Sequence, residues 1–213
     1  MMQDLTPDGL LSTTRAVRRR LDLDRPVPDD LIRECVALAL QAPSGSNEVV
    51  MRFVVVRDPG KISAIGAIYA ECWGRYAASP RFAARLASST GEARAQQERS
   101  MASSRWLSEQ IGRMPALVIG CRSKRIDGAA GAAAAAAYGS ILPAMWSLML
   151  AARARGLGTA WTTMHLSMEG EVAALLGIPV EWQQVCMTPV AFTVGTEFKP
   201  ALRPAPDEVI LWR

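Results

Sequence analysis

A stretch from Gly128 to Ala152 carries no charged side chain and is long enough to cross a bilayer as a helix. Its first half is mostly alanine, and glycine, serine and proline dilute the second half. The free energy of transfer of this stretch from water into lipid is therefore less favourable than that of a helix rich in Leu, Ile and Phe. We expect a buried helix of a water-soluble protein instead. Because alanine lets another backbone come close, Tyr138 to Leu150 is expected at the centre of a domain or at a subunit interface.

The composition predicts a globular chain. With 213 residues, 50% of them hydrophobic, and no linker or internal repeat, we expect one domain over residues 1–213. The four cysteines lie far apart and the N-terminus lacks a signal-peptide pattern, which predicts a cytoplasmic chain with free thiols. The one histidine, His165, makes a histidine-based metal site or a Ser-His-Asp triad hard to assemble, so no metal is expected.

The net charge of +4 raises the question of an anionic partner. It is densest around residues 15–20, where Arg15, Arg18, Arg19 and Arg20 fall together. By charge alone, a solvated helix face is favoured over an arm that binds nucleic acid. No aromatic residues are interleaved with the arginines, so nucleic acid gains little support.

Apolar periodicity and turn residues indicate an α+β fold with a mixed sheet. The expected helices cover residues 29–42, 61–77 and 91–112, an alanine-rich stretch that ends at 156, and 169–176. The expected strands cover 52–56, 116–121, 159–163 and 183–195. Pro189 is expected to interrupt the last strand. Neither a GxGxxG turn nor a GxxxxGKS/T loop is present, so the usual nucleotide cradles are absent.

Three separated segments offer groups for one phosphorylated, planar ligand. The arginine cluster precedes the first core helix, the polar turn Ser44 to Asn47 follows that helix, and the C-terminal segment supplies Lys199 and Arg203. Arginines that are far apart in sequence can clamp one phosphate, and a Ser/Gly/Asn turn offers hydroxyl, amide and bare backbone to a flat polar ring. We therefore expect a phosphorylated cofactor with a planar ring.

Four motifs, in order, resemble the FMN-dependent nitroreductase superfamily over nearly the whole chain. "TTRAVRRRLDLDRPVPDDLI" is similar to the opening Arg-Ser-x-Arg motif and "QAPSGSN" to the Ala-Pro-Ser-x-x-Asn turn. "ARARGLGTAWTTMHL" is similar to the helix-Gly-Leu-Gly-strand motif, and "TPVAFTVGTEFKPALRPAPDEVI" to the closing strand with its basic tail. The resemblance implies a nitroreductase-like sheet flanked by helices, in an intertwined homodimer with two FMN sites at the interface.

The resemblance also implies the residues that bind the cofactor. Residues that match the opening motif are implied to hold the phosphate, the ribityl chain and the pyrimidine side of FMN. Further contacts are implied for residues that match the turn, the strand end and the basic tail. The implied FMN-binding residues are Arg15, Ala16, Arg18, Ser44, Asn47, Thr162, Thr163 and Arg203. Three positions depart from the family pattern: Ala16 replaces its Ser, and Val49 and Met51 stand where many members have Gln and Trp.

The implied activity is oxidation of NADH or NADPH, with two-step transfer of hydride through FMN to a nitroaromatic, quinone or similar electron-poor acceptor. Arg18 is expected to stabilise negative charge on reduced flavin, and no side chain is assigned as catalytic. Ser46, Trp73 and Tyr76 are the expected substrate contacts, with core packing as the alternative for the two aromatics. His165 is expected to form structural hydrogen bonds, with a contact to the flavin as the alternative.

Other functions stay open on sequence grounds. One is a flavin-binding or sequestering protein without turnover, and another is a nucleic-acid-binding protein that uses the arginine cluster. A third keeps the flavin enzyme but changes the reaction to reductive dehalogenation or a biosynthetic dehydrogenation. The acceptor and the choice of NADH or NADPH do not follow from the sequence.

Overall fold

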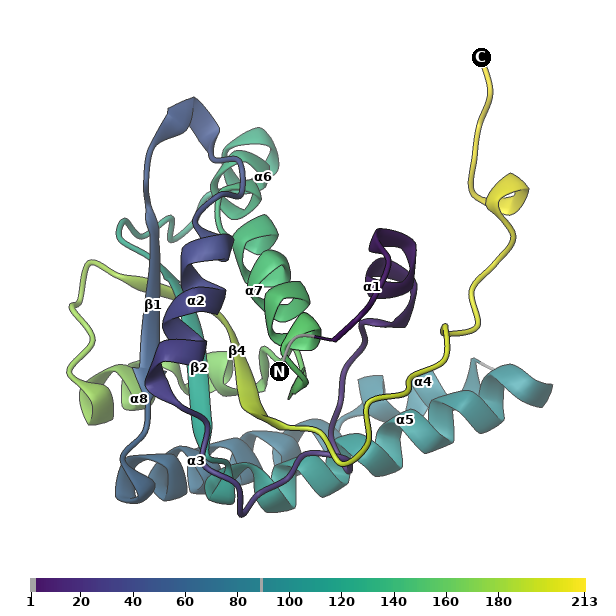
Figure 1. Cartoon of the computed structure of the whole chain (residues 1–213), viewed down its shortest axis with the longest axis horizontal. Helices are drawn as coiled ribbons and strands as arrows, with labels where there is room; N and C mark the ends of the chain where they lie inside the picture. The colour runs from purple at the N-terminus through teal and green to yellow at the C-terminus, as the bar shows by residue number, and fades with distance from the viewer. Residues whose placement is uncertain (1–2, 89) are drawn as a thin grey trace.

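A computed structural model describes residues 3–88 and 90–213 of the chain (Figure 1). Its centre is a four-stranded sheet in the order β1-β2-β4-β3. The strands are β1 (Met51–Val56), β2 (Ala116–Arg122), β3 (Leu157–Thr159) and β4 (Gln183–Phe192). The α+β prediction is confirmed. All three pairings between these strands are antiparallel, whereas a mixed sheet was expected.

Strand β4 is continuous through Pro189, so the predicted interruption is wrong. Pro189 pairs in register with Leu117 of β2. The irregularity lies elsewhere, as a register shift between Gly120 and Cys121. Proline has no N–H, so a strand tolerates it at a position where no N–H is required to donate to a neighbouring strand. Irregularities such as β-bulges disrupt the hydrogen bonds between strands locally.

Helices cover both faces of the sheet. They are α1 (Pro7–Thr13), α2 (Asp29–Ala39), α3 (Pro59–Ala77), α4 (Pro80–Ala87), α5 (Gly91–Gln110), α6 (Gly131–Gly139), α7 (Leu142–Ala154) and α8 (Glu169–Leu176). Helix α8 matches its predicted bounds, and α1 and α4 were not predicted. The short 3₁₀ segments include Gly45–Asn47, Ile111–Arg113, Met164–Met168 and Pro206–Glu208.

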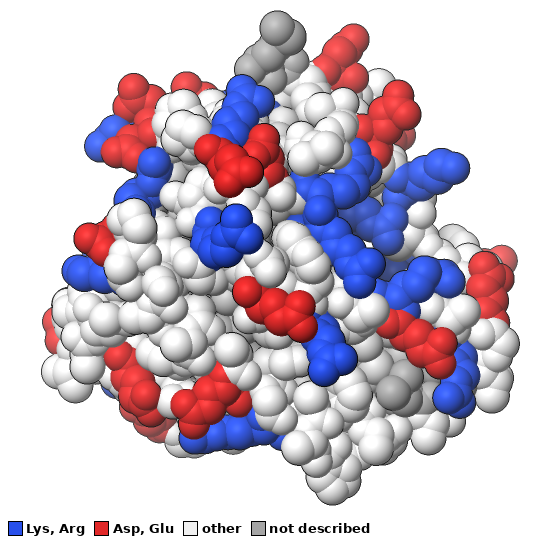
Figure 2. Space-filling view, turned by 90° about the horizontal axis from the view of Figure 1, so that it is seen from below, with Lys and Arg blue, Asp and Glu red and all other residues white. Residues whose placement is uncertain are grey.

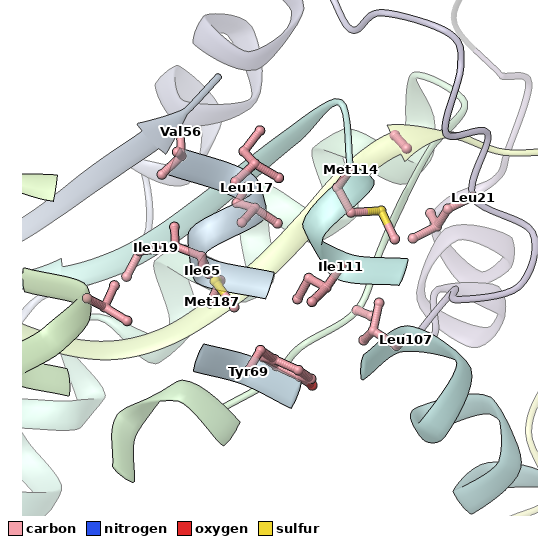
Figure 3. Packing of buried hydrophobic residues seen from close by; sticks show 14 of the residues in the cluster. Leu21, Val56, Ile65, Tyr69, Leu107, Ile111, Met114, Leu117, Ile119 and Met187 are labelled. Atoms are coloured by element: carbon pink, nitrogen blue, oxygen red, sulfur yellow. The ribbon is translucent and has the colours of Figure 1, made fainter. Parts of the chain in front are cut away.

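The alternation of side chains along β2 divides the core in two. Leu117 and Ile119 pack with Ile65 and Tyr69 of α3, as Figure 3 shows. Their neighbours in the strand, such as Val118, belong to a second cluster formed with α2 and α7. This period of two is what places α3 with the end of α5 on one face and the α2–α7 pair on the other.

The charge-free stretch is two helices, not one. The span Gly131–Ala154 is long and apolar enough to pass a membrane-span test by length and composition, with a mean hydropathy of 1.4. The turn at Ser140 and Ile141 separates α6 from α7, and Ile141 is fully buried. Met145 and Leu148 are 0% and 1% exposed within the chain itself. The outer surface of this region is formed instead by the alanines of α6 and by Leu142 and Trp146.

The C-terminal segment after Pro200 runs away from the sheet (Figure 1). Its last residues expose large apolar side chains that pack against no core cluster of the described chain. These are Val209, Ile210, Leu211 and Trp212. An apolar end of this kind is typical of a segment that meets another chain.

Candidate functional site

The arginine cluster lies in an irregular segment that ends in a turn at Arg19 and Arg20, so the expectation of a solvated helix face is wrong. The Val17 N–H donates to the Thr159 carbonyl of β3 at 2.8 Å. A Cβ at Gly158 would lie 2.7 Å from Cδ2 of Leu21 and 3.1 Å from Cβ of Val17. Only glycine allows the segment to approach β3 this closely, and the contact fixes where the neighbouring arginines emerge.

A basic cavity of about 470 Å³ lies beside this segment. It brings together Arg15, Ala16, Arg18 and Arg203, four of the residues expected to bind the cofactor. Arg99 adds a fourth guanidinium, and Glu92 is the one acidic residue in the lining. Among the described residues, none of the four arginines forms an ion pair. Unpaired guanidiniums gathered in a cavity are typical of a site for a phosphate or another anion.

Helix α5 supplies one wall of this basic cavity, which the sequence reasoning missed. The α5 residues in the lining are Glu92, Gln96, Arg99, Ser100 and Ser103. The helix is tied to the arginine segment because Arg18 Nη1 donates to Ser103 Oγ at 3.2 Å. The signal was present, since the spacings of four, three and four from Glu92 through Gln96 and Arg99 to Ser103 place polar residues on one helix face.

A second cavity, of about 920 Å³, lies beside α3 and the end of β3. Its lining includes Trp73, Tyr76, Thr162 and Thr163, all of them predicted site residues. Trp73 and Tyr76 are half-buried, with ring centroids 5.8 Å apart. Both rings therefore form part of a cavity wall, and their contact with a substrate stays a prediction. We call this space the aromatic cavity.

Tyr69 of α3 is a further lining residue that the sequence reasoning did not select. Its hydroxyl lies 2.8 Å from Thr162 Oγ1, and Thr162 also exchanges two backbone hydrogen bonds with Met187 of β4. Burial raises the pKa of the Tyr69 phenol, and the Thr162 hydrogen bond and the charge of Arg18 offset this in part. The phenol therefore stays protonated at neutral pH, and the strand end is held firmly against α3.

Arg18 lines both cavities and joins them. Its Nε is buried and has no hydrogen-bond partner within the described chain. Burial lowers its pKa, but an arginine remains charged at neutral pH. A buried charged donor without a partner is costly, and a ligand that accepts a hydrogen bond there removes that cost. Figure 2 shows basic side chains gathered on one part of the face seen from below.

The polar turn does not reach either cavity. Ser44, Ser46 and Asn47 are absent from both linings, and Figure 1 shows the start of β1 near α6, at the far end of the sheet from α3 and α5. The Gly45 N–H donates to Ser140 Oγ at 2.9 Å, which fixes the turn on the end of α6. Ser46 and Asn47 are exposed, with φ of 54° and 57°. A left-handed conformation is uncommon for serine and carries some backbone strain.

A family model for the Nitroreductase family matches residues 11–195. The chain belongs to the Nitroreductase family. The predicted family is thus confirmed, and the match includes all predicted site residues except Arg203. A comparison by sequence with curated proteins finds no significant match.

Solved structures share the fold of this nitroreductase-family chain at low identity. The FMN and NADPH-dependent nitroreductase NfnB from sphigopyxis sp. strain HMH is 20% identical, with a TM-score of 0.68, covering 98% of this chain and 99% of that one. An iodotyrosine deiodinase bound to FMN and 3-iodo-L-tyrosine is 21% identical, with a TM-score of 0.66 and coverage of 93% and 94%. A BluB-like flavoprotein from Clostridium difficile 630 is 15% identical, with a TM-score of 0.65 and coverage of 93% and 95%.

The two departures after the turn have different surroundings in this nitroreductase-family chain. Met51 is 4% exposed and packs with Ile141 and Met145, so it is a core residue. Val49 is 66% exposed. The Met51 side chain therefore packs in the core, whereas the exposed Val49 side chain is accessible to another chain.

His165 is fully buried and does not line either cavity. Neither ring nitrogen meets the geometric criteria for a hydrogen bond within the described chain, but the Gln184 side chain is close enough to act on the ring as a hydrogen-bond partner. Burial lowers the pKa of His165 to about 4, and the charge of Glu169 and the Gln184 side chain oppose this shift in part. The imidazole is neutral at neutral pH.

This burial predicts a pH-dependent loss of stability in acid. The unfolded chain takes up a proton on His165 below its ordinary pKa of 6.5, while the folded chain does so only near about 4. Neutral His165 therefore makes its full contribution to the free energy of unfolding above pH 6.5. This contribution is lost as the pH falls toward 4, and the total loss is about 3 kcal/mol. Urea unfolding of wild type and His165→Gln over this range checks it. Equal slopes of unfolding free energy against pH in the two proteins would contradict the assignment.

Proposed function

We propose that the protein is an FMN-dependent NAD(P)H oxidoreductase that reduces nitroaromatic, quinone or similar electron-poor acceptors by a ping-pong mechanism. The observation that carries this proposal is the position of Arg18. It joins a cavity whose four arginines form no ion pair within the described chain to a cavity walled by aromatic and threonine side chains, and its buried Nε has no partner among the same residues. A phosphate at one end and a planar polar ring at the other complement this arrangement.

The residues present fit FMN. Arg15, Arg99 and Arg203 surround space for a phosphate, and within the described part of the chain the Arg203 side chain donates only to the adjacent Leu202 carbonyl, at 3.0 Å. Arg15 Nη1 donates to the Lys199 carbonyl at 2.9 Å, which holds the basic tail next to the arginine segment. Family membership and structural neighbours that bind FMN support the same cofactor.

Bound FMN would supply hydride transfer between the nicotinamide of NADH or NADPH and the acceptor. The chain's own residues orient the reactants. Arg18 places a fixed positive charge where negative charge develops, in a site that needs no reorganisation. Thr162 is held by Tyr69 and Met187, so the strand end forms a rigid wall. No side chain of the aromatic cavity is required as a general acid, because solvent can supply protons.

We also propose a homodimer, as in the sequence-based expectation. The turn with Ser44, Ser46 and Asn47 lies outside the cavities of its own chain, so these residues can contact cofactor or substrate only across an interface. Exposed apolar surface is available for that interface on α6, at Leu142 and Trp146, and at the C-terminal end. Symmetric pairing of two chains would cover this surface.

The two half-reactions test the activity. Anaerobic NADPH or NADH should bleach the visible absorbance of the protein, and a later addition of menadione or a nitroaromatic should restore it. Steady-state plots at several acceptor concentrations should then be parallel, as in a ping-pong mechanism. A protein that retains FMN but is not bleached by either nucleotide is a flavin-binding protein without turnover.

Reductive dehalogenation is the second candidate, because the iodotyrosine deiodinase shares the fold over 93% of this chain. It predicts iodide release from 3-iodo-L-tyrosine by the reduced protein. Reoxidation by menadione without iodide release from that compound favours the nitroreductase-type activity.

A further inference from the structure

The aromatic cavity has a one-sided charge distribution. Among the residues that the structure describes, three arginines line it, Arg18, Arg75 and Arg81, and no Asp or Glu does. Arg18 lies where this cavity meets the basic cavity, whereas Arg75 and Arg81 are exposed. We call this exposed pair the rim arginines. The proposed cofactor gives the charge of Arg18 a role, but it gives none to the charges of the rim arginines.

The two rim arginines differ in how they are paired. Arg75 forms an ion pair with Glu71 one turn earlier on α3. Arg81 forms no hydrogen bond or ion pair with the described part of the chain. It is the second residue of α4, whose N-terminus is capped by Ser79. A cation in the first turn is unfavourable with the helix dipole, so Arg81 adds to a local positive potential instead of cancelling one.

Aromatic rings lie beside Arg81. Phe82, the next residue, has its ring centroid 5.4 Å from that of Tyr76 and 6.0 Å from that of Trp73, in edge-on contacts. Trp73 and Tyr76 line the aromatic cavity together with Trp161. The cavity therefore offers ring surface for a planar group next to an unneutralised guanidinium.

We propose that the aromatic cavity selects acceptors that carry a carboxylate on an aromatic ring, and that Arg81 is the residue that determines this specificity. The inference rests on the proposed oxidoreductase function and names the substrate class of that site. The ring packs against Trp73 and Tyr76 while the carboxylate reaches Arg81. With para-nitrobenzoate, NADPH and one proton yield the nitroso acid, NADP⁺ and water, a two-electron reduction in which the carboxylate is unchanged.

The test compares para-nitrobenzoate with para-nitrobenzamide, its neutral analogue of nearly equal shape, on the FMN-loaded protein. Wild type should have a higher kcat/KM for the acid. Arg81→Gln should lower that value about three- to tenfold and leave the value for the amide unchanged. Arg81→Lys should restore part of the preference. Arg113→Gln is the matched control, because Arg113 is exposed and lines no cavity described above.

Two further measurements distinguish an effect of Arg81 on binding of the acceptor from an effect on reduction by NADPH. Equilibrium binding of benzoate, which is not reduced, should weaken in Arg81→Gln by a similar factor, whereas benzamide binding should not change. The rate of bleaching by NADPH should also be the same in Arg81→Gln and wild type. Slower bleaching in the variant would mean that Arg81 contacts the phosphates of the nucleotide, and it would overturn the proposal.

Equal kcat/KM of wild type for acid and amide would overturn the proposal as well. That result leaves the proposed function intact, provided that the protein holds FMN, is bleached by a nicotinamide nucleotide and reduces the amide. A protein that takes up no FMN instead contradicts the proposed function itself. The failures of the two proposals are therefore distinguishable.

Discussion

Replacing Arg18 by Ala should weaken FMN binding about tenfold to a hundredfold while the chain still folds. Arg18 lines both cavities, and its buried Nε has no partner within the described chain. A charge-assisted hydrogen bond to a ligand contributes about 1.5 to 3 kcal/mol, and the variant loses the charge together with its donors. Titration of the flavin-free protein with FMN, followed by flavin fluorescence, measures the change.

Arg19→Ala is the matched control for this experiment. Arg19 is the next residue, is exposed, and lines neither cavity, so its loss should change the dissociation constant little. Circular dichroism of both variants should match wild type. Equal FMN affinity in Arg18→Ala and Arg19→Ala would contradict the proposed cofactor position.

A charge at Trp146 should dissociate the proposed homodimer and release the flavin together. Trp146 is 38% exposed on α7, in the apolar surface that we assign to the interface. Leaving an uncompensated charge in a buried contact costs about 3 to 5 kcal/mol, which raises a dimer dissociation constant about a hundredfold or more. Light scattering of Trp146→Glu should therefore give a monomer at concentrations where wild type is a dimer.

Flavin should be lost because, in the proposed homodimer, the turn at Ser44 and Asn47 of one chain contacts the cofactor of the other. Val180→Glu provides the control, since Val180 is 86% exposed and is not among the residues assigned to the interface. Charges at Met145 or Leu148 would not serve, because both are buried in the core of their own chain and a charge there unfolds it. A monomeric Trp146→Glu that holds FMN as tightly as wild type would argue against a site shared between chains.

Local sequence signals predicted the elements whose boundaries are set locally. Helix α8 begins and ends as expected at Glu169 and Leu176, where Gly177 takes the left-handed conformation that ends many helices. The break between α6 and α7 was missed, because its partner is distant in sequence: Ser140 accepts a hydrogen bond from Gly45, 95 residues away. Helix α4 was also missed, although Ser79 and Pro80 form a recognisable helix start.

The candidate site was predicted unevenly for a similar reason. Family motifs identified Arg15, Arg18 and Arg203, which the structure brings together in one cavity. Arg99 and Tyr69 were missed, because a helix face that closes a cavity is defined only once the helix is docked. The motif also selected the turn at Ser44, which lines neither cavity of its own chain, so its role at the cofactor stays a prediction that depends on the proposed homodimer.

The central claim is that this nitroreductase-family chain holds FMN where Arg18 joins the two cavities. The most direct measurement is the visible spectrum of the purified protein, followed by identification of the chromophore released on denaturation. We expect a yellow protein that releases FMN and no FAD, with one FMN per chain after reconstitution. A colourless protein that takes up no FMN from solution would contradict the account.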